Sequence, residues 1–226
     1  MYVRRATIAD VADISTLLIR AMSGDGLWKR LHPGREEHPH DFRRTVLRRQ
    51  KARFYNGCTV YVAVTDESDS EWDGRERAVA MMAMSPSSSK PKTYASIEQI
   101  QGLATGAWNK FNLLLQSIEE QYIWYFNLDK SVDKAQAQRF RGQVAASNTL
   151  DEYEPYWYVE LFATDPDFQR RGLAGRLIEE AKNIGQDDKM PVCLHASVSG
   201  RPFYTSKGFK GLGKEAEGDA MIWLPT

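Results

Sequence analysis

The chain has 226 residues, of which 30 are Lys or Arg and 30 are Asp or Glu, so its formal net charge at pH 7 is zero. A neutral chain lacks the broad basic surface typical of nucleic-acid-binding proteins, and we expect no nucleic-acid partner. No apolar run approaches about 18 residues and no apolar leader stands at the N-terminus, which argues against membrane spanning and secretion. We therefore expect one cytoplasmic domain, residues 1–226, with a substantial core.

The first part of the chain predicts a strand and a helix, followed by an irregular stretch. Residues 2–7 are typical of a strand, and residues 11–22 carry apolar side chains at helical spacing. Asp10 stands directly before this helix, where a carboxylate can cap the first N–H groups. Residues 24–40 are rich in Gly, Pro and His, and we expect them to form a loop.

Several side chains in this loop have the chemical types of metal ligands. Their spacing lacks the helical or paired-cysteine arrangement typical of metal sites, so we expect a solvated or substrate-facing loop and no metal. These side chains are His32, Glu36, Glu37, His38 and His40.

A second helix and two strands follow. Asp41 is expected to cap a helix at residues 42–55, whose basic residues form a solvated face. Residues 58–65 and 77–85 are rich in apolar and β-branched side chains and predict two antiparallel strands. The acidic stretch 66–73 between them is expected to be a surface turn.

A change of composition separates this part from the rest. Residues 85–91 have the Ser, Pro and Lys content of a linker. Beyond them, residues 107–125 repeat apolar side chains at helical spacing, and residues 129–146 predict a more polar helix. The two helices indicate an insertion at about residues 86–155. Two roles stay open for it: one wall of a binding pocket, or a cover for the sheet or a dimer contact.

Two cysteines and one histidine lie on predicted strands. Cys58 and Cys193 are expected to be reduced core thiols, because a cytoplasmic chain rarely keeps a disulfide. His195 alternates with apolar neighbours, which favours a core histidine with satisfied hydrogen bonds over a catalytic one.

The most informative stretch is residues 156–182, where a strand passes through a basic, glycine-containing turn into an amphipathic helix. Aromatic and β-branched residues indicate the strand at 157–164, and Asp165-Pro166 ends it. In the turn, small residues let backbone N–H groups converge on an anion beside a helix N-terminus. We expect a diphosphate there, with two arginines neutralising its remaining charge. The turn consists of Gln169, Arg170, Arg171, Gly172, Leu173, Ala174 and Gly175.

Known phosphate-binding motifs narrow the kind of nucleotide site. The turn lacks the G-x-x-x-x-G-K-[ST] of the P-loop and the G-x-G-x-x-G of dinucleotide-binding folds. The Q-x-x-G-x-A at residues 169–174 instead resembles the Q/R-x-x-G-x-G/A signature of the GCN5-related N-acetyltransferase (GNAT) family. A predicted strand at 191–197 and the segment 200–209, GRPFYTSKGF, follow in that family's order, so the resemblance covers residues 156–210.

The resemblance implies an α+β fold. A mixed, mostly antiparallel twisted sheet would be flanked by helices, with its fourth and fifth strands splayed apart. The acetyl-CoA-binding core would span about residues 156–210. The insertion would lie between the third and fourth strands, on the side where the family binds the acceptor.

Acetyl-CoA is the cosubstrate that the resemblance implies. In the family the turn wraps its diphosphate, and the backbone of Phe162, Ala163 and Thr164 would hydrogen-bond its pantetheine arm. A backbone N–H of Ala163 or Thr164 would meet the thioester carbonyl. Ser197 and Ser199 stand where relatives often carry an asparagine that contacts the cofactor.

Tyr204 occupies the family's position for the tyrosine that protonates the departing CoA thiolate. A phenol suits this role, because its reference pKa of about 10 is near that of an alkyl thiol. The alternative is a tyrosine that only packs, with its hydroxyl bonded to the backbone.

Glu160 is implied as the catalytic base. Glu160 and Tyr158 precede Thr164 by even offsets, which places all three on one strand face. Relatives carry base or water-holding residues at these offsets. Alternatives for Glu160 are a structural salt bridge and a carboxylate that binds the acceptor ammonium.

The activity that follows from the resemblance is transfer of an acetyl group to a primary amine of a small molecule, by direct attack in a ternary complex. Abundant aromatic residues in the insertion suit an acceptor with an apolar part. A peptide or protein amine acetyltransferase and a non-catalytic CoA-binding protein remain alternatives. A homodimer is compatible with the sequence.

Overall fold

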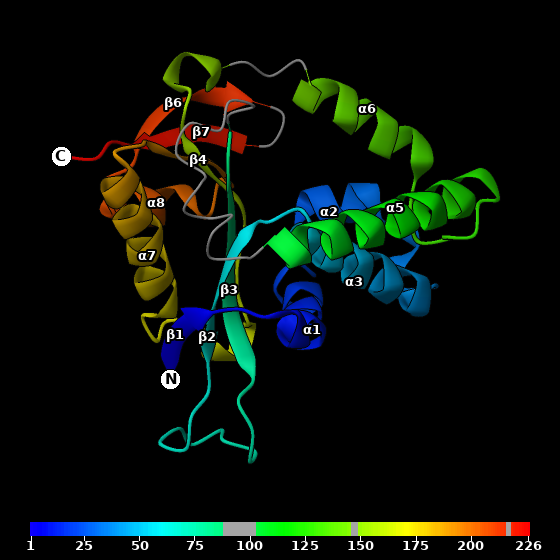
Figure 1. Ribbon diagram of the computed structural model, residues 1–226, viewed down its shortest axis with the longest axis horizontal. Helices are drawn as coiled ribbons and strands as arrows, with labels where there is room; N and C mark the ends of the chain where they lie inside the picture. The colour runs from blue at the N-terminus through cyan, green and yellow to red at the C-terminus, as the bar shows by residue number, and fades with distance from the viewer. Residues whose placement is uncertain (88–102, 146–148, 216–217) are drawn as a thin grey trace.

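One twisted sheet runs through the molecule, with helices on both faces (Figure 1). The computed structural model describes residues 1–87, 103–145, 149–215 and 218–226. Within them the strand order is β1-β2-β3-β4-β5-β7-β6. The strands are β1 (Tyr2–Arg5), β2 (Thr59–Val64), β3 (Ala78–Pro86), β4 (Trp157–Thr164), β5 (Val192–Ala196), β6 (Lys210–Glu215) and β7 (Gly218–Trp223).

The pairing of the strands is mixed. β4 and β5 run parallel, and the other neighbouring pairs are antiparallel. The expected α+β fold with a mostly antiparallel sheet is therefore confirmed, as are the two strands predicted from residues 58–65 and 77–85.

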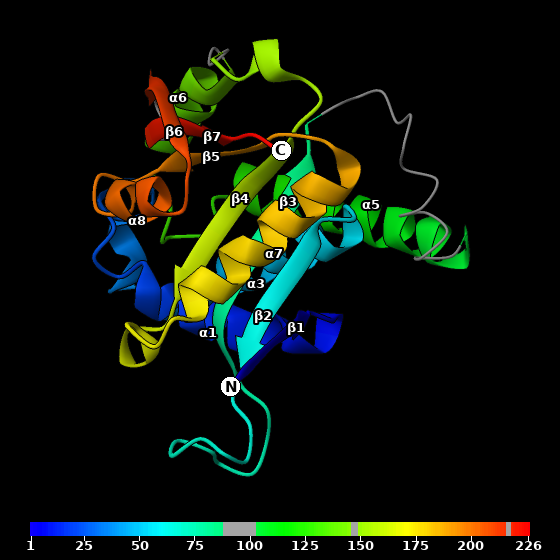
Figure 2. The same cartoon turned by 90° about the vertical axis from the view of Figure 1, so that its left-hand side faces the viewer.

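Helices from different parts of the chain cover the two faces of the sheet. Figure 1 views the sheet nearly edge-on, and Figure 2 shows α7 lying across it. We call the side covered by α7 the α7 face and the opposite side the α3 face. The helices of the α7 face are α7 (Leu173–Asp188) and α8 (Arg201–Ser206), and those of the α3 face are α1 (Val11–Ala21), α2 (Gly26–Leu31) and α3 (Pro39–Tyr55).

Each face has its own apolar core. On the α7 face, Leu177 and Ile178 are fully buried against Met82 and Leu194. The helical spacing that the sequence shows after residue 172 therefore predicts the buried stripe of α7 correctly. On the α3 face the fully buried side chains include Ile14, Leu18, Val62 and Met81.

The prediction of a loop at residues 24–40 is wrong, because part of this segment is helical. α2 occupies Gly26–Leu31, and a 3-10 turn follows at Pro33–Arg35. The Asp25 carboxylate accepts a hydrogen bond of 2.9 Å from the Trp28 N–H, which starts the helix. A helix of six residues is too short to show a periodic pattern in a sequence rich in Gly and Pro.

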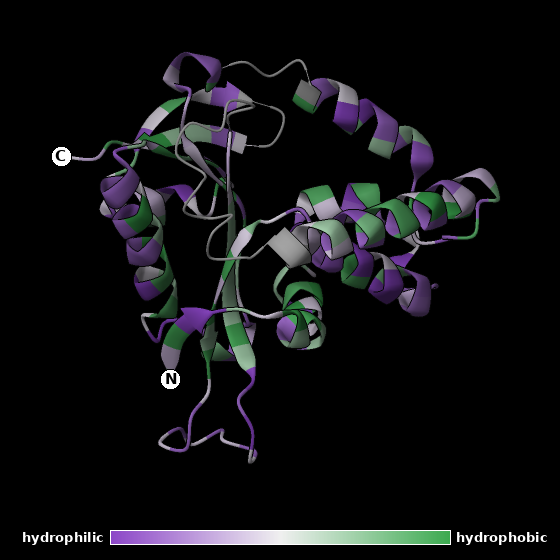
Figure 3. Cartoon of the chain, in the orientation of Figure 1, coloured by the Kyte–Doolittle hydropathy of each residue, from purple (hydrophilic) through white to green (hydrophobic). Residues whose placement is uncertain are grey.

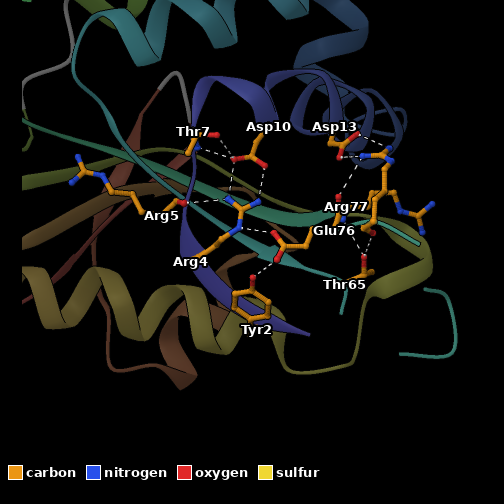
Figure 4. A network of polar contacts seen from close by, with 10 residues as sticks. Tyr2, Arg4, Arg5, Thr7, Asp10, Asp13, Thr65, Glu76 and Arg77 are labelled. Carbon is orange, nitrogen blue, oxygen red and sulfur yellow. Dashed lines mark hydrogen bonds and ion pairs between the residues drawn. The ribbon is translucent and has the colours of Figure 1, made fainter. Parts of the chain in front are cut away.

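The two predicted aspartate caps are also wrong. Asp10 does not cap α1: its carboxylate accepts 2.7 Å from the Thr7 N–H and pairs with both terminal nitrogens of Arg4 at 2.8 and 2.9 Å (Figure 4). α3 begins at Pro39, and Asp41 already lies in its first turn. Each carboxylate lies at the start of the helix it was expected to cap. Asp10 binds Arg4 and the Thr7 N–H, and Asp41 binds the Lys130 N–H, instead of the first N–H groups of the helix.

The helical insertion lies between β3 and β4, as expected. It contains α5 (Leu103–Tyr125) and α6 (Lys134–Ala145). Ser85 and Pro86, assigned to a linker by composition, are the end of β3, and residues 88–91 of that linker lie outside the described residues.

The two helices of the insertion pack on other helices, and Leu150 beyond them packs against Cys193 and Ile222 of the sheet. α5 contacts α3, and α6 contacts α2. Large apolar side chains of α5 remain exposed. Figure 3 shows hydrophobic residues along much of this helix. The exposed side chains include Trp108, Leu114, Ile118 and Tyr122.

The last two strands, β6 and β7, have no counterpart among the predicted elements. β6 has the sequence KGLGKE, whose two glycines and three charges hide a strand pattern. β7 supplies the apolar side chains and pairs with both β5 and β6. Cys58 and Cys193 are buried free thiols, as predicted, and burial raises the pKa of each to about 12.

Candidate active site

A cavity of about 1150 Å³ runs along one side of β4. One end reaches the turn before α7, and the other is walled by α2, α3 and α6. The wall excludes Arg171 but contains the other site residues expected from the sequence. These are Glu160, Phe162, Ala163, Thr164, Gln169, Arg170, Gly172, Leu173, Ala174, Gly175, Ser197, Ser199 and Tyr204.

The cavity exists because β5 diverges from β4. The two strands pair only from Trp157, opposite Val192, to Val159, opposite Leu194. Beyond Leu194, β5 continues to pair with β7, while β4 continues to pair with β3. Residues 160–164 therefore have no neighbouring strand on the β5 side within the described chain, and their backbone faces the cavity.

A β-bulge in β4 lies where the strands part. Val159 is paired with Met84 and Leu161 with Ala83, so Glu160 is the extra residue without a partner in β3. A bulge bends its strand and redirects the side chains that follow. The bend at Glu160 accounts for the divergence of β4 from β5.

The bulge also reverses the alternation of side chains along β4. Val159 packs into the α7-face core, but Leu161 contacts the α3-face core although it is two residues further on. Tyr158 and Glu160 thus share the α3 face, while Thr164 follows Ala163 of the α3-face core and points the other way. The expectation that all three share one face is wrong for Thr164.

Glu160 is held by three side chains of the α3 face. The Arg53 Nε donates to its Oε2 at 3.2 Å, the Ser85 hydroxyl donates to its Oε1 at 2.6 Å, and the Cys58 thiol lies 3.4 Å from Oε1. The Glu160 side chain keeps 27% of its surface exposed, on the cavity side. It is therefore a fixed carboxylate that forms the salt bridge left open as one alternative.

His195 lines the cavity beside Tyr158, so it is not the core histidine that was predicted, although it has the expected hydrogen-bond partner. The Tyr158 hydroxyl and the His195 Nδ1 are 2.8 Å apart, and both side chains are half-buried. Tyr158 and His195 lie on the two parallel strands at the point where these separate. The pattern of β5 hides this, because alternation identifies the face of a side chain but not whether that face is covered.

Tyr204 approaches the same gap from the α7 face. Its ring packs against Phe162, Phe203 and Phe209, with ring centroids 6.0, 5.2 and 5.8 Å away. Burial raises the pKa of this phenol above its usual value of 10. In the described part of the chain its hydroxyl has no hydrogen-bond partner, so the alternative of a hydroxyl bonded to the backbone is not what the structure has.

The turn before α7 presents unpaired backbone N–H groups. Arg170 and Gly172 adopt left-handed conformations, with φ of 63° and 78°, which aim successive amides to one side. Among the described residues, no acceptor receives the N–H groups of residues 170–175. Together with the N-terminus of α7 they form a site suited to an anion.

The cations around the turn differ from those expected. Arg171 donates to Glu71 at 2.7 and 2.9 Å and stacks over Phe168, so its charge is already neutralised. Glu71 belongs to the acidic stretch 66–73, which is thus tied to the turn. Lys207 instead lines the cavity, and its Nζ lies 3.3 Å from the position that a Cβ on Gly175 would take.

Lys207 was not predicted as a site residue, although it stands in FYTSKGF, three residues after Tyr204. Its neighbour Glu179 is 3.7 Å away. Ser197 and Ser199 lie near this end of the cavity, with their hydroxyls 3.2 Å apart, and Ser197 also accepts from the Gly200 N–H at the start of α8.

Three helices form the opposite end of the cavity, and their proximity was not predicted from the sequence. Trp28 and Leu31 come from α2, Arg49 and Gln50 from α3, and Phe140 from α6. One helix of the insertion therefore contributes to the cavity wall, which is the first of the two roles left open for it.

The remaining expectations concern metals and membranes. Within the described ranges, His, Cys, Asp and Glu side chains form no group of three that could hold a metal ion. His32, which was expected to lie in a solvated or substrate-facing loop, is buried. A search of the same residues finds no helix with the length and apolar character needed to cross a membrane.

Part of the chain matches the model of a known protein family. The model of the acetyltransferase (GNAT) domain matches residues 125–225, which include α6, the cavity strands β4 and β5, the turn and α8. Comparison with curated protein sequences gives no match.

Solved structures resemble the whole chain at low identity. The structure described as histone acetyltransferase HPA2 and related acetyltransferase from Corynebacterium glutamicum has a TM-score of 0.57 and 16% identity, covering 99% of this chain and 94% of that chain. Arylalkylamine N-acetyltransferase 2 from Aedes aegypti has a TM-score of 0.52 and 12% identity, covering 100% and 99%. The polyamine N-acetyltransferase of Drosophila melanogaster, described as forming N-acetylagmatine, has a TM-score of 0.50 and 18% identity, covering 98% and 96%. These similarities establish the fold.

Proposed function

The chain carries an acetyltransferase domain of the GNAT family, and from that premise we propose that it transfers the acetyl group of acetyl-CoA to a primary amine of a small molecule. GNAT acetyltransferases use acetyl-CoA as the acyl donor. The observation that carries the proposal is the gap between β4 and β5, where candidate proton-accepting and proton-donating side chains meet from opposite faces of the sheet.

The donor half of the cavity suits coenzyme A. Unpaired N–H groups at residues 170–175 favour the diphosphate, and Lys207 adds a positive charge beside them. The open edge of β4 at residues 160–164 offers backbone groups to the amide-containing pantetheine arm, as another strand would. Phe162, Ala163 and Thr164 are therefore assigned to the arm, and Ser197 and Ser199 to its far side.

The reaction requires one proton to leave the amine and one to reach the sulfur. The neutral amine nitrogen attacks the thioester carbonyl carbon, and the tetrahedral oxyanion accepts a hydrogen bond from the N–H of Ala163 or Thr164. The C–S bond then breaks and the thiolate takes a proton from the Tyr204 hydroxyl. The products are the N-acetylated amine and CoA.

Glu160 binds the acceptor ammonium and receives its proton, directly or through water. Its cavity-facing surface is open, although Arg53 and Ser85 occupy part of the carboxylate. The Tyr158–His195 pair lies on the same face and provides the next acceptor for that proton. Proton removal on the α3 face and proton delivery on the α7 face keep the two transfers apart.

Small amines are favoured as acceptors by the shape of the acceptor end. α2, α3 and α6 all contribute to the cavity wall there, and Trp28, Leu31 and Phe140 make part of it apolar. Structural neighbours of this chain include enzymes named for arylalkylamines and polyamines. A cytoplasmic location and a homodimer are part of the proposal and are not needed for the chemistry.

The test is thiol release measured with DTNB from acetyl-CoA across a panel of amines. Turnover with free small amines supports the proposal. Turnover with peptides and none with small amines would replace it with a peptide or protein acetyltransferase. Calorimetric binding of CoA without turnover on any amine would replace it with a non-catalytic CoA-binding protein.

A further inference from the structure

Arg49 is a cation at the acceptor end of the cavity that no acidic side chain neutralises. The next arginines on α3 are paired, Arg48 with Glu119 at 3.6 Å and Arg53 with Glu160 at 3.2 Å. Arg49 forms no ion pair with any carboxylate in the part of the chain that the structure describes, and its side chain is exposed to the cavity. Glu120 and Asp129 act on it only at longer range.

A neutral histidine holds Arg49 in place. The Arg49 Nη1 lies 3.2 Å from the His32 Nε2, and because a guanidinium can only donate, this nitrogen of His32 is the acceptor. Burial and, as the second cause, the nearby Arg49 lower the pKa of His32 to about 4, so the ring is uncharged near neutral pH. His32 therefore orients the guanidinium without cancelling its charge.

The orientation of His32 is itself fixed by its surroundings. Its ring packs against Phe42 and Trp28, with centroids 5.0 and 6.3 Å away. With Nε2 accepting, Nδ1 carries the hydrogen and faces the Ser131 hydroxyl at 3.5 Å. Ser131 in turn donates to the Asp129 carboxylate at 2.6 Å. The series Asp129, Ser131, His32 and Arg49 ends at the cavity wall.

Asp129 and Ser131, the two members of this series that are furthest from the cavity, belong to the insertion. The Gly34 N–H donates to the Ser131 carbonyl at 3.3 Å, and a Cβ on Gly34 would lie 2.5 Å from the Lys130 carbonyl oxygen. The Asp41 carboxylate accepts from the Lys130 N–H at 3.1 Å. The segment 129–131 is thus held against the 3-10 turn at Pro33–Arg35 and the first turn of α3, which gives the insertion a role in positioning Arg49.

We propose that Arg49 binds an anionic group of the acceptor, so that the preferred substrate is a small amine that also carries a carboxylate or a comparable anion. This inference rests on the proposed acetyltransferase activity. An arginine fork with free N–H groups binds a carboxylate through two parallel hydrogen bonds. A second ammonium, as in a polyamine, would meet an uncompensated positive charge at the same place.

The spacing along α3 limits the length of the substrate. Arg49 and Arg53, which is joined to Glu160, are four residues apart on α3, which is about 6 Å along the helix axis. An amine bound at Glu160 would therefore place its anionic group about 6 Å further along the cavity. A short amino acid with its amine and carboxylate at opposite ends of an aliphatic chain, such as 5-aminopentanoate, fits this separation, with its apolar part near Trp28 and Phe140. An α-amino acid holds the two groups closer together.

Matched pairs of amines test the inference in the intact protein. Phenylalanine is compared with phenethylamine, and 5-aminopentanoate with pentylamine, by kcat/KM for thiol release. We expect at least one carboxylated amine to exceed its partner by about tenfold or more, since a charge-assisted pair contributes about 1.5–3 kcal/mol. Equal or lower values for both carboxylated amines overturn the inference and leave the proposed function standing.

Variants identify the residue that produces the preference. Arg49→Gln is expected to reduce the ratio within the preferred pair to near one, mainly by raising KM for the carboxylated amine, and Arg49→Lys to retain part of it. His32→Leu should lower the ratio, and His32→Gln, whose amide oxygen can still accept from Arg49, should restore it. Arg44→Gln is the control, because Arg44 is exposed on the same helix and lines neither end of the cavity. An unchanged ratio in Arg49→Gln contradicts the assignment.

A binding measurement keeps the inference separate from catalysis. The affinity of 5-acetamidopentanoate is compared with that of N-pentylacetamide by calorimetry, with CoA present, in the native protein and in Arg49→Gln. Tighter binding of the carboxylated product to the native protein supports the anion site even if no amine is turned over, in which case the activity itself is wrong. No preference in binding, or one that survives Arg49→Gln, overturns the anion site.

Discussion

The two ends of the cavity are constructed in different ways. At the donor end, one continuous segment of residues 170–175 presents backbone N–H groups, and the side chain of Arg171 is turned away to Glu71. At the acceptor end, side chains from α2, α3 and α6 meet, and those of His32, Arg49 and Ser131 form a connected series. The donor end should thus be sensitive to backbone changes, and the acceptor end to side-chain changes.

The largest effect is expected from a substitution at the backbone of the turn. Gly172→Trp should abolish CoA binding, with a loss of at least about 10³-fold in affinity. Gly172 has a φ of 78°, a conformation that L side chains rarely adopt, and the indole would occupy the space before the N–H groups. Each charge-assisted hydrogen bond lost there contributes about 1.5–3 kcal/mol. Calorimetry with CoA measures the change.

Gly74→Trp is the matched control. Gly74 also has a positive φ, 93°, and no atom within 4 Å of a Cβ, but it lies in the loop between β2 and β3 and does not line the cavity. The control should bear similar backbone strain and retain CoA affinity. Normal affinity in Gly172→Trp would show that the turn does not bind the diphosphate of CoA.

The next effect is expected at the gap between the two ends. Tyr204→Phe should lower kcat by about 10²-fold, the usual scale for a lost proton donor, with little change in CoA affinity. Burial raises the pKa of Tyr204 above its usual value of 10, so the phenol stays protonated at pH 10. Activity should therefore show no loss below pH 10 that is caused by ionisation of Tyr204. Steady-state kinetics across pH, with Tyr61→Phe as a control outside the cavity, measures both. Unchanged kcat in Tyr204→Phe would reassign the proton donor.

A smaller difference should separate two cations near the turn. Lys207→Gln is expected to weaken CoA binding by about 3- to 10-fold, because it removes a charge that the diphosphate can use. Arg171→Gln should change the affinity less, because Glu71 already neutralises that guanidinium. The opposite order in calorimetry would show that Arg171 leaves Glu71 when CoA binds.

The smallest effect on the site is expected from a change at the other end of the sheet. Burial by itself would raise the pKa of Asp10, but Arg4 and the Thr7 N–H outweigh it and hold the pKa below the usual 3.8. The resulting stabilisation is fully present above the ordinary pKa and is lost as pH falls through the lowered one. Asp10→Asn should reduce the free energy of unfolding at pH 7 by about 1–3 kcal/mol, and by less below pH 3.

Urea denaturation at both pH values measures the Asp10 effect, and KM for acetyl-CoA should stay unchanged in the variant. Asp13→Asn, which breaks the more exposed pair with Arg75, should cost less stability. A greater loss in Asp13→Asn, or an effect of Asp10→Asn on KM, would contradict the separation of this network from the site.

The same contrast between local and assembled structure explains what the sequence could predict. The strand, turn and helix around residues 156–182 follow from consecutive residues, so their positions were predictable. α2 was missed because it is short and follows a glycine-rich stretch, and β6 was missed because its apolar support comes from β7.

The parts of the site that were not predicted depend on tertiary contacts. The bulge at Glu160 is set by the register of β3 against β4, and strand alternation therefore gave the wrong face for Thr164. The pairing of Arg171 with Glu71 joins residues 100 positions apart, and that of Arg49 with His32 depends on a buried ring clamped by the insertion. Neither contact has a local sequence signal.

A crystal structure of the protein with CoA tests the central claim most directly. The account predicts that the diphosphate accepts hydrogen bonds from N–H groups of residues 170–175, that pantetheine lies along β4 at residues 160–164, and that the sulfur lies within hydrogen-bonding reach of the Tyr204 hydroxyl. CoA bound elsewhere, or β5 closed against β4 beyond Val159 with the sulfur excluded, would contradict it.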